Sequence, residues 1–253
     1  IMNITEQKIQ LPTTKRAATL YIGIPKNPVT RILYVHDAQN IFGDKTASYG
    51  MGWNIHKALK SMNVHDVLVA GVNCAEGYAR LDEYAPFPID YRPLKNTPAK
   101  GGLGDDYLYD LIHTIIPEVE AKYPIKPENR MLMGSSMGGI ISLYAGFEHP
   151  EIFPRVASIS GAYYVSLKAF QNYFKQTFEK VPEFVYLDVG DEEEGLADQS
   201  GYLNAHAMIK TALKRHLKPS AWFETIIPGG EHNEVHWHKR LPDIINQLIK
   251  KSR

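Results

Sequence analysis

Short apolar runs alternate along this chain with longer segments in which apolar residues recur every three or four positions. The short runs are nearly continuous in Val, Ile, Leu, Tyr and Phe, a pattern typical of strands that are buried on both faces of a sheet. We therefore predict seven strands: Ala18–Ile24, Arg31–His36, Asp66–Asn73, Arg130–Gly134, Val156–Ser160, Phe184–Val189 and Trp222–Ile227.

The longer segments lie between these runs and have the apolar spacing of helices. They are Asn54–Met62, Asp105–Lys122, Met137–His149, Leu167–Phe178, Leu203–His216 and His236–Lys250. Alternation of strands and helices predicts an α/β fold with a mostly parallel sheet and helices on both faces. The first two predicted strands can form an antiparallel edge. No repeat or linker divides the chain, so we expect residues 1–253 to form one domain.

One segment, residues 74–103, breaks this alternation. It has no periodic pattern and is rich in proline and aromatic residues: Pro86, Pro88, Pro93, Pro98, Tyr78, Tyr84, Phe87 and Tyr91. A stretch of this length without a pattern often forms a functional loop or a lid. We favour a wall of the substrate pocket over a surface excursion packed by its own aromatic side chains.

Composition and charge exclude several classes of protein. The 28 basic and 28 acidic residues cancel, so no global field attracts nucleic acid or an anionic membrane. The single cysteine, Cys74, rules out an internal disulfide framework. No apolar run approaches the roughly 20 residues that span a bilayer, and the polar first residues lack the apolar core of a signal peptide. We expect a cytoplasmic monomer or homo-oligomer that binds neither nucleic acid nor membranes.

The strongest motif is Gly134-Ser135-Ser136-Met137-Gly138, between a predicted strand and a predicted helix. Gly-x-Ser-x-Gly in this setting is the pattern of a nucleophile elbow, in which the serine occupies a strained turn and its second neighbours must be small. Ser135 would need glycines at positions 133 and 137, and both are methionine, so the pattern selects Ser136. The alternatives are a structural turn or a phosphate cradle, but no Gly-Lys-Ser/Thr follows.

A nucleophilic serine needs a histidine base and a third group that orients the base. In α/β-hydrolases these residues follow in the order serine, acid, histidine. His232 lies in a glycine-bearing loop directly after a predicted strand, where a base at the carboxyl edge of the sheet belongs. A rival interpretation takes His232, His236 and His238 as zinc ligands. It leaves the elbow unexplained and the His-Glu-x-x-His pattern is absent, so we predict no metal.

The acid is expected in the run Asp191-Glu192-Glu193-Glu194, which follows the strand Phe184–Val189. Most of such a run is solvated, but one carboxylate can point inward. Asp188 lies within the strand and is less able to reach a loop histidine. Spacing alone leaves Asp191, Glu193 and Glu194 open.

Five stretches of the chain carry a family resemblance, which spans roughly residues 31–248. They lie at 33–42, 80–86, 134–139, 187–190 and 229–232. With them the chain resembles the putative-esterase family of α/β-hydrolases. This family includes esterase D (S-formylglutathione hydrolase), feruloyl and acetyl-xylan esterases, and enterochelin-esterase-like proteins. The resemblance implies a single-domain α/β-hydrolase.

The resemblance also implies roles for particular residues. The family places its acid about three residues after the glycine that ends the strand, which favours Glu193, with Asp191 as runner-up. Its oxyanion-hole donors correspond to the backbone N–H groups of Gln39 and Met137. A further stretch, Arg80-x-x-Glu83-Tyr84, resembles a signature of the simpler bacterial members. We interpret it as an ion pair that fixes a loop near the pocket.

We therefore expect a serine carboxylesterase that hydrolyses small soluble esters through an acyl-enzyme and needs no cofactor. The substrate size follows from the resemblance, because the chain matches little more than the family's bare catalytic domain. The alternatives are an S-formylglutathione hydrolase-like thioesterase, an acetyl or feruloyl esterase acting on carbohydrate-linked esters, and an acyltransferase. A metallohydrolase and a non-catalytic binding protein are less favoured.

Overall fold

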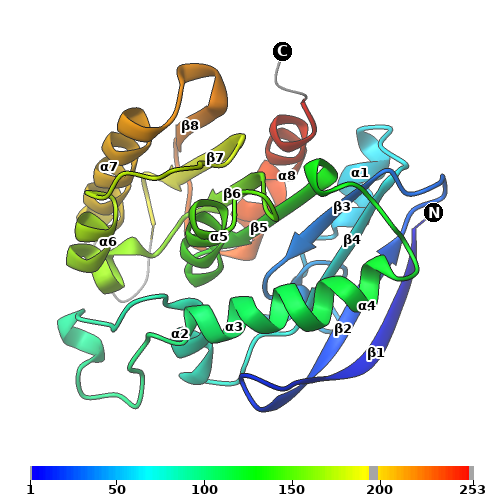
Figure 1. The fold of residues 1–253 in the computed structure, drawn as a ribbon, viewed down its shortest axis with the longest axis horizontal. Helices are drawn as coiled ribbons and strands as arrows, with labels where there is room; N and C mark the ends of the chain where they lie inside the picture. Colours follow the sequence, from blue (N-terminus) through cyan, green and yellow to red (C-terminus); the bar gives the residue numbers. More distant parts are fainter. Residues whose placement is uncertain (1, 194–198, 251–253) are drawn as a thin grey trace.

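An eight-stranded sheet forms the centre of the molecule (Figure 1). The computed structural model describes residues 2–193 and 199–250. The strands stand in the order β1-β2-β4-β3-β5-β6-β7-β8, and those from β4 to β8 run parallel. Their bounds are β1 Asn3–Leu11, β2 Arg16–Ile24, β3 Arg31–Val35, β4 Val67–Val72, β5 Arg130–Ser135, β6 Arg155–Ile159, β7 Phe184–Gly190 and β8 Trp222–Ile227. The predicted fold class, a mostly parallel α/β sheet, is confirmed.

The antiparallel edge differs from the sequence prediction. Strand β3 lies inside the sheet, parallel to both β4 and β5. The edge is instead the hairpin of β1 and β2, and β2 runs antiparallel to β4. No strand was predicted at β1 because its residues are mostly polar and exposed, as an edge strand outside the core allows.

Helices cover both faces of the sheet. Their bounds are α1 Ile55–Ser61, α2 Ala79–Tyr84, α3 Gly104–Asp110, α4 Ile116–Glu120, α5 Met137–Glu148, α6 Leu167–Tyr173, α7 Gln199–His216 and α8 Glu234–Ile249. Helices α3 and α4 continue one another through a π-helical turn, Leu111–Ile115, so the single predicted helix bulges at its centre. Helices α1 and α8 pack on one face, and α3, α4, α5 and α7 pack on the other (Figure 1).

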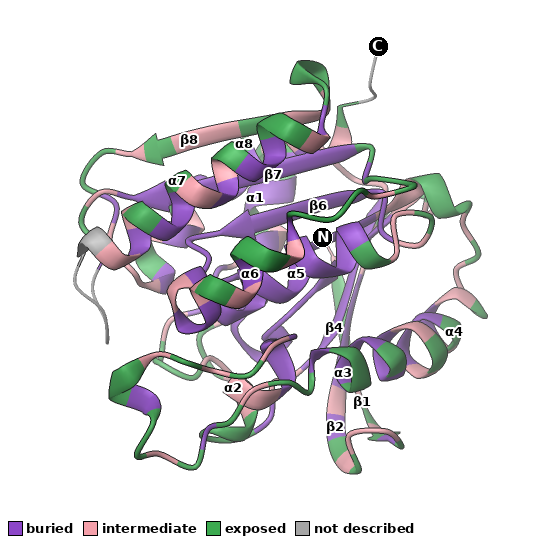
Figure 2. Ribbon diagram, turned by 60° about the vertical axis from the view of Figure 1, so that its left-hand side comes forward, coloured by how far each residue is buried: buried purple, intermediate pink, exposed green. Residues whose placement is uncertain are grey.

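The core is divided by the sheet into two apolar layers. One layer joins β-strand residues to α1 and α8, and the other joins them to α3, α5, α6 and α7. Every residue of β4, β6 and β7 is buried, which explains why these strands read as continuous apolar runs (Figure 2). Strand β8, at the sheet's edge, is only partly buried (Figure 2). Among the described residues, no helix is both long and apolar enough to cross a membrane.

The segment 74–103 is ordered by contacts with the rest of the protein. It contains α2 and a short 3-10 helix, and a β-bridge joins Pro88 to Gly101. The Asp82 carboxylate accepts the backbone N–H groups of Lys100 and Gly101, which closes the loop. Phe87 packs edge-on against Phe170 of α6, with ring centroids 5.0 Å apart. The segment is therefore anchored to the helical layer above the carboxyl edge of the sheet.

Candidate active site

Four polar side chains gather at the carboxyl edge of the sheet, because parallel strands end at the same edge. Ser136 follows β5, Ser160 follows β6, Glu193 follows β7 and His232 follows β8. The register of β5, β6, β7 and β8 brings these ends side by side. Residues far apart in the sequence therefore share one site.

Ser136 occupies the strained turn that the glycine spacing predicts. Its backbone lies at φ 57° and ψ −119°, a conformation that non-glycine residues rarely adopt. A Cβ atom on Gly134 would lie 2.5 Å from the backbone oxygen of Gly138, so the turn closes only with glycine at this position. The Ser136 N–H donates to the Ile159 carbonyl at 2.9 Å, which holds the turn against β6.

A continuous hydrogen-bond chain connects Ser136, His232 and Glu193. His232 Nε2 lies 2.9 Å from Ser136 Oγ, and His232 Nδ1 lies 2.6 Å from Glu193 Oε2. Nδ1–H donates to the carboxylate, so Nε2 keeps its lone pair and accepts the serine hydroxyl. The structure thus brings together the three side chains that the sequence and the family resemblance singled out.

Glu193 is buried and fully engaged. Only 1% of its surface is exposed. Oε1 accepts the Gly190 N–H at 2.6 Å and the Ser160 hydroxyl at 2.5 Å. Burial favours a higher pKa for Glu193, but the hydrogen bond and charge of His232, with the bonds from Ser160 and Gly190, hold its pKa below the usual value. Glu193 is therefore a carboxylate at neutral pH.

The neighbouring acids have other partners. Asp191 Oδ1 accepts the Gly229 N–H at 2.7 Å and so joins the loop after β7 to the loop after β8. Asp188 is fully buried and bonds Tyr186, Ser160 and Arg240. Glu194, the third open candidate, lies outside the described residues. In the described part of this acidic run, Glu193 is the residue in contact with the imidazole.

Three residues that sequence reasoning missed support the carboxylate. Ser160 donates to Glu193 and accepts the Trp237 indole N–H at 3.1 Å and an Arg240 N–H at 2.9 Å. The Trp237 ring also meets the His232 ring edge-on, with centroids 4.9 Å apart. Trp237 and Arg240 stand one turn apart on α8, a spacing visible in the sequence, but no motif linked them to the acid.

The two predicted oxyanion donors lie at the ends of β5 and β3. Met137 is the first residue of α5, where a helix leaves its N–H groups without an intrahelical acceptor. Gln39 lies in a 3-10 turn after Asp37, and its side chain turns away to bond Cys74 and Ser48. Within residues 2–193 and 199–250, neither backbone N–H has a hydrogen-bond acceptor. Both N–H groups are therefore free to donate.

Comparison with known proteins adds the family. The family model described as "Putative esterase" matches residues 12–248. The chain belongs to this family. Membership places it among the carboxylic ester hydrolases.

Relatives and solved structures agree with this assignment. The chain is 27% identical over 229 residues to the "Uncharacterized protein YbbA" of Bacillus subtilis (strain 168), covering 87% of this chain and 86% of YbbA. The BES protein from Bacillus cereus has a TM-score of 0.73 at 17% identity, covering 98% of this chain and 95% of that one. An IroE-like serine hydrolase from Shewanella oneidensis has a TM-score of 0.77 at 15% identity, and the match covers 96% of this chain and 79% of that one. The enterobactin esterase FES from Shigella flexneri has a TM-score of 0.71 at 16% identity, and the match covers 98% of this chain and 60% of that one. At sequence identities this low, the structural similarity shows only that these proteins share a fold with this chain.

A cavity of about 430 Å³ opens onto Ser136 and His232 in this esterase. Gln39, Arg80 and Glu234 also line it, and a second cleft of about 680 Å³ shares Gln39 and Arg80 with it. The first part of segment 74–103 lines the second cleft, from Cys74 through Leu81. Burial and the nearby Asp37 charge raise the pKa of the Cys74 thiol to about 12, so it is protonated and no rival nucleophile.

The Arg80-x-x-Glu83-Tyr84 stretch holds the turn that carries Gln39 in place, but not through an ion pair between its own residues. Arg80 binds both oxygens of Asp37 at 2.7 and 2.8 Å, and Glu83 binds Arg16 on β2 at 2.8 Å. The Tyr84 hydroxyl accepts the Asp37 N–H at 3.0 Å. Although burial favours a higher pKa for Asp37, the Arg80 guanidinium holds that pKa below its usual value. Where the sequence suggested one ion pair, the structure has two, Arg80 with Asp37 and Glu83 with Arg16.

The three histidines considered as zinc ligands point to different partners. His232 bonds Ser136 and Glu193, while the His236 ring accepts the Glu231 N–H at 3.2 Å. The His238 ring donates to the Trp53 carbonyl. No group of three or more metal-binding side chains occurs in the described part of the chain.

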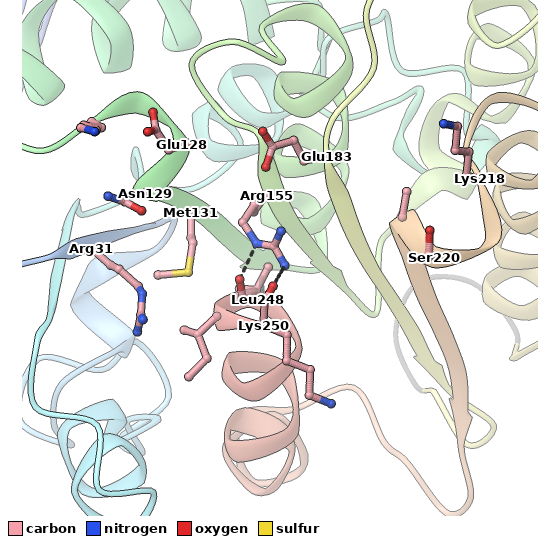
Figure 3. A pocket seen from close by; sticks show the side chains of 13 residues that line it. Arg31, Glu128, Asn129, Met131, Arg155, Glu183, Lys218, Ser220, Leu248 and Lys250 are labelled. Atoms are coloured by element: carbon pink, nitrogen blue, oxygen red, sulfur yellow. Dashed lines mark hydrogen bonds between the residues drawn. The ribbon is translucent and has the colours of Figure 1, made fainter. Parts of the chain in front are cut away.

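A separate cavity of about 780 Å³ lies at the opposite edge of the sheet, near the amino ends of the strands (Figure 3). Arg155, at the start of β6, reaches across it and donates to the Leu248 carbonyl at the end of α8 (Figure 3). The cavity contains none of the residues of the serine site. Arg155 caps the carboxyl end of α8 and so has a structural role.

Proposed function

We propose that this esterase is a serine carboxylesterase that acts on small esters through an acyl-enzyme. The observation that carries the proposal is the chain of hydrogen bonds from Glu193 through His232 to Ser136, at 2.6 and 2.9 Å. A serine hydroxyl is a weak nucleophile until a base removes its proton as it attacks. His232 is in position to do this, and Glu193 keeps its Nδ1 protonated.

Acylation follows from these positions. Ser136 Oγ attacks the ester carbonyl while His232 Nε2 takes the serine proton, and the carbonyl oxygen becomes an oxyanion. The N–H groups of Gln39 and Met137 stabilise this charge. The imidazolium, stabilised by Glu193, then gives its proton to the alcohol oxygen. The C–O bond breaks, the alcohol leaves and the acyl group stays on Ser136.

Deacylation repeats the same steps with water. His232 takes a proton from the water, whose oxygen attacks the acyl carbon. The resulting imidazolium returns the proton to Ser136 Oγ as the bond between Oγ and the acyl carbon breaks. The carboxylic acid is released. Every proton is moved by the chain's own side chains, so the proposed cycle needs no cofactor.

The size of the cavity supports a small substrate. A hollow of about 430 Å³ is near the lower end of the range for small-molecule sites. Its lining includes charged groups, Asp37 and Arg80 in a pair and Glu234 at the start of α8. Such a mixed lining suits a compact, partly polar ester better than a long acyl chain.

Pre-steady-state kinetics with p-nitrophenyl acetate test the proposal. We expect a burst of about one nitrophenolate per chain, followed by slower turnover, and no burst from Ser136→Ala. A substrate panel of acetyl, butyryl and feruloyl esters and a glutathione thioester then tests the substrate class. The absence of a burst, together with an undiminished rate in Ser136→Ala, would overturn the mechanism. A preference for the thioester or the feruloyl ester above the acetyl ester would overturn the substrate class alone.

A further inference from the structure

Tyr202 is a second group in contact with Nε2 of His232, beside Ser136, and the mechanism above does not use it. It lies on α7 and its side chain is almost completely buried. Its hydroxyl oxygen is 3.3 Å from His232 Nε2, the nitrogen that faces Ser136. The two rings are tilted against each other with centroids 4.8 Å apart.

In the resting site the Tyr202 hydroxyl also makes hydrogen bonds with Ser136 and with the Tyr164 hydroxyl, while Nε2 has no free lone pair to offer it. The neutral imidazole offers one lone pair there, and Ser136 Oγ occupies it at the shorter distance of 2.9 Å. Burial raises the pKa of Tyr202 above its usual range, so the phenol keeps its proton. Tyr202 is therefore a buried, protonated phenol whose resting partners are the neutral hydroxyls of Ser136 and Tyr164 and the occupied Nε2.

A better acceptor arrives when the tetrahedral intermediate breaks down. The alcohol oxygen takes its proton from Nε2, so it must come within hydrogen-bond distance of that atom. A hydroxyl 3.3 Å from the same nitrogen is then within reach of this oxygen. The oxygen gains negative charge as the C–O bond stretches, which makes it a stronger acceptor than the resting imidazole.

We propose that the Tyr202 hydroxyl donates a hydrogen bond to the leaving-group oxygen while His232 transfers its proton to that oxygen. Tyr202 keeps its own proton throughout. The C–O bond breaks, its electron pair stays on the alcohol oxygen, and the imidazole returns to its neutral form. The inference rests on the proposed function and adds to it a donor for the departing alcohol.

Neighbouring aromatic residues hold the hydroxyl in place. The Tyr164 hydroxyl lies 3.4 Å from that of Tyr202, and their rings meet edge-on at 4.8 Å. Tyr91, from segment 74–103, packs in the same way on Tyr164 at 4.9 Å. These ring contacts limit the motion of Tyr202. Tyr164→Phe keeps the ring contacts and removes only the weak 3.4 Å contact between hydroxyls, so it offers a matched control.

The proposal predicts a dependence on the leaving group. A hydrogen bond to the leaving oxygen matters most for a basic alkoxide and least for a nitrophenolate, whose charge is delocalised. We expect Tyr202→Phe to lower kcat/KM for ethyl and trifluoroethyl acetates, with the larger loss for ethyl acetate, about tenfold to a hundredfold. For p-nitrophenyl acetate we expect a loss of less than about threefold.

The experiment measures kcat/KM for this series in wild type, Tyr202→Phe and Tyr164→Phe, because this parameter reports acylation. Tyr164→Phe should stay within about threefold for every ester. An equal loss across the series would assign Tyr202 a structural role in placing His232, and no loss would remove it from the reaction. Either result would overturn the proposal.

Two further measurements keep the outcome decisive. The burst amplitude with p-nitrophenyl acetate shows whether Tyr202→Phe is folded. Replacement of Tyr202 by 3-fluorotyrosine keeps the side chain and strengthens the donor, so the leaving-group dependence should become shallower than in wild type; a steeper dependence contradicts the inference. Failure of the proposed function looks different, because wild type itself would then show no burst.

Discussion

Glu193→Gln replaces one buried carboxylate oxygen by an NH₂ group. We expect this small change to lower kcat strongly. The side chain is held on both sides, with His232 Nδ1 at 2.6 Å from one oxygen and the Gly190 N–H at 2.6 Å from the other. A carboxylate accepts from both, but an amide has only one accepting end. In either orientation, the NH₂ group of glutamine therefore meets a poor partner.

The two orientations fail for different reasons. If the amide oxygen faces Gly190 and Ser160, its NH₂ faces His232 Nδ1 and selects the tautomer that carries its proton on Nε2. That nitrogen then cannot accept the proton of Ser136. If the amide is reversed, its NH₂ faces the Gly190 N–H at a distance suited to a donor and an acceptor. The charge that stabilises the imidazolium is lost in both cases.

The expected loss in kcat is roughly 100-fold to 10,000-fold. At 1.36 kcal/mol for each factor of ten, this corresponds to about 2.7 to 5.4 kcal/mol of transition-state stabilisation. KM should change much less, because Glu193 lies behind the imidazole and does not line the substrate cavity. The change should therefore appear in kcat rather than in binding.

Steady-state hydrolysis of p-nitrophenyl acetate measures this loss, and Glu192→Gln is the matched control. Glu192 is exposed in the same turn and should stay within about tenfold of wild type. Circular dichroism confirms that both variants are folded. A Glu193→Gln enzyme with more than a tenth of wild-type kcat would refute the reasoning, because the carboxylate would then be dispensable.

The remaining predictions concern neighbouring residues. Ser135→Ala should keep most of the activity, since Ser135 ends β5 and is not part of the hydrogen-bond chain of Ser136, His232 and Glu193; a dead variant contradicts the choice of elbow serine. Asp191→Asn should be mild in kcat assays, because an amide oxygen still accepts the Gly229 N–H; a loss as large as that of Glu193→Gln would move the acid to position 191. Asp37→Asn should lower the free energy of unfolding in urea by about 2 to 4 kcal/mol at pH 7. The folded-state pKa of Asp37 is lowered, so this difference should shrink as the pH falls below about 4; a constant difference contradicts the ion-pair account.

The sheet could be predicted where burial leaves a continuous apolar run. The strands β4, β6 and β7 are buried along their whole length, so their sequences show little else than apolar and small residues. Strand β1 is exposed for most of its length and has no such signal. The place of β3 inside the sheet depends on crossover connections, which periodicity does not encode.

A site residue could be predicted from the sequence where its role requires particular residues at fixed positions beside it. The strained turn at Ser136 requires small neighbours, so the nucleophile is visible in five residues. The acid has no such constraint, because the geometry of a turn decides which of several similar carboxylates points inward. Ser160 and Tyr202 reach the site from separate elements, with contacts that span many residues of sequence and leave no motif.

Covalent labelling tests the central claim, that Ser136 is the nucleophile of this esterase. Wild-type protein treated with a fluorophosphonate should gain the mass of one adduct per chain, and loss of activity should parallel labelling. Fragmentation of the tryptic peptide that carries both elbow serines should place the adduct on Ser136. Ser135→Ala should label as wild type does, and Ser136→Ala should not label. An adduct on Ser135, or full activity in a protein that resists labelling, would contradict the account.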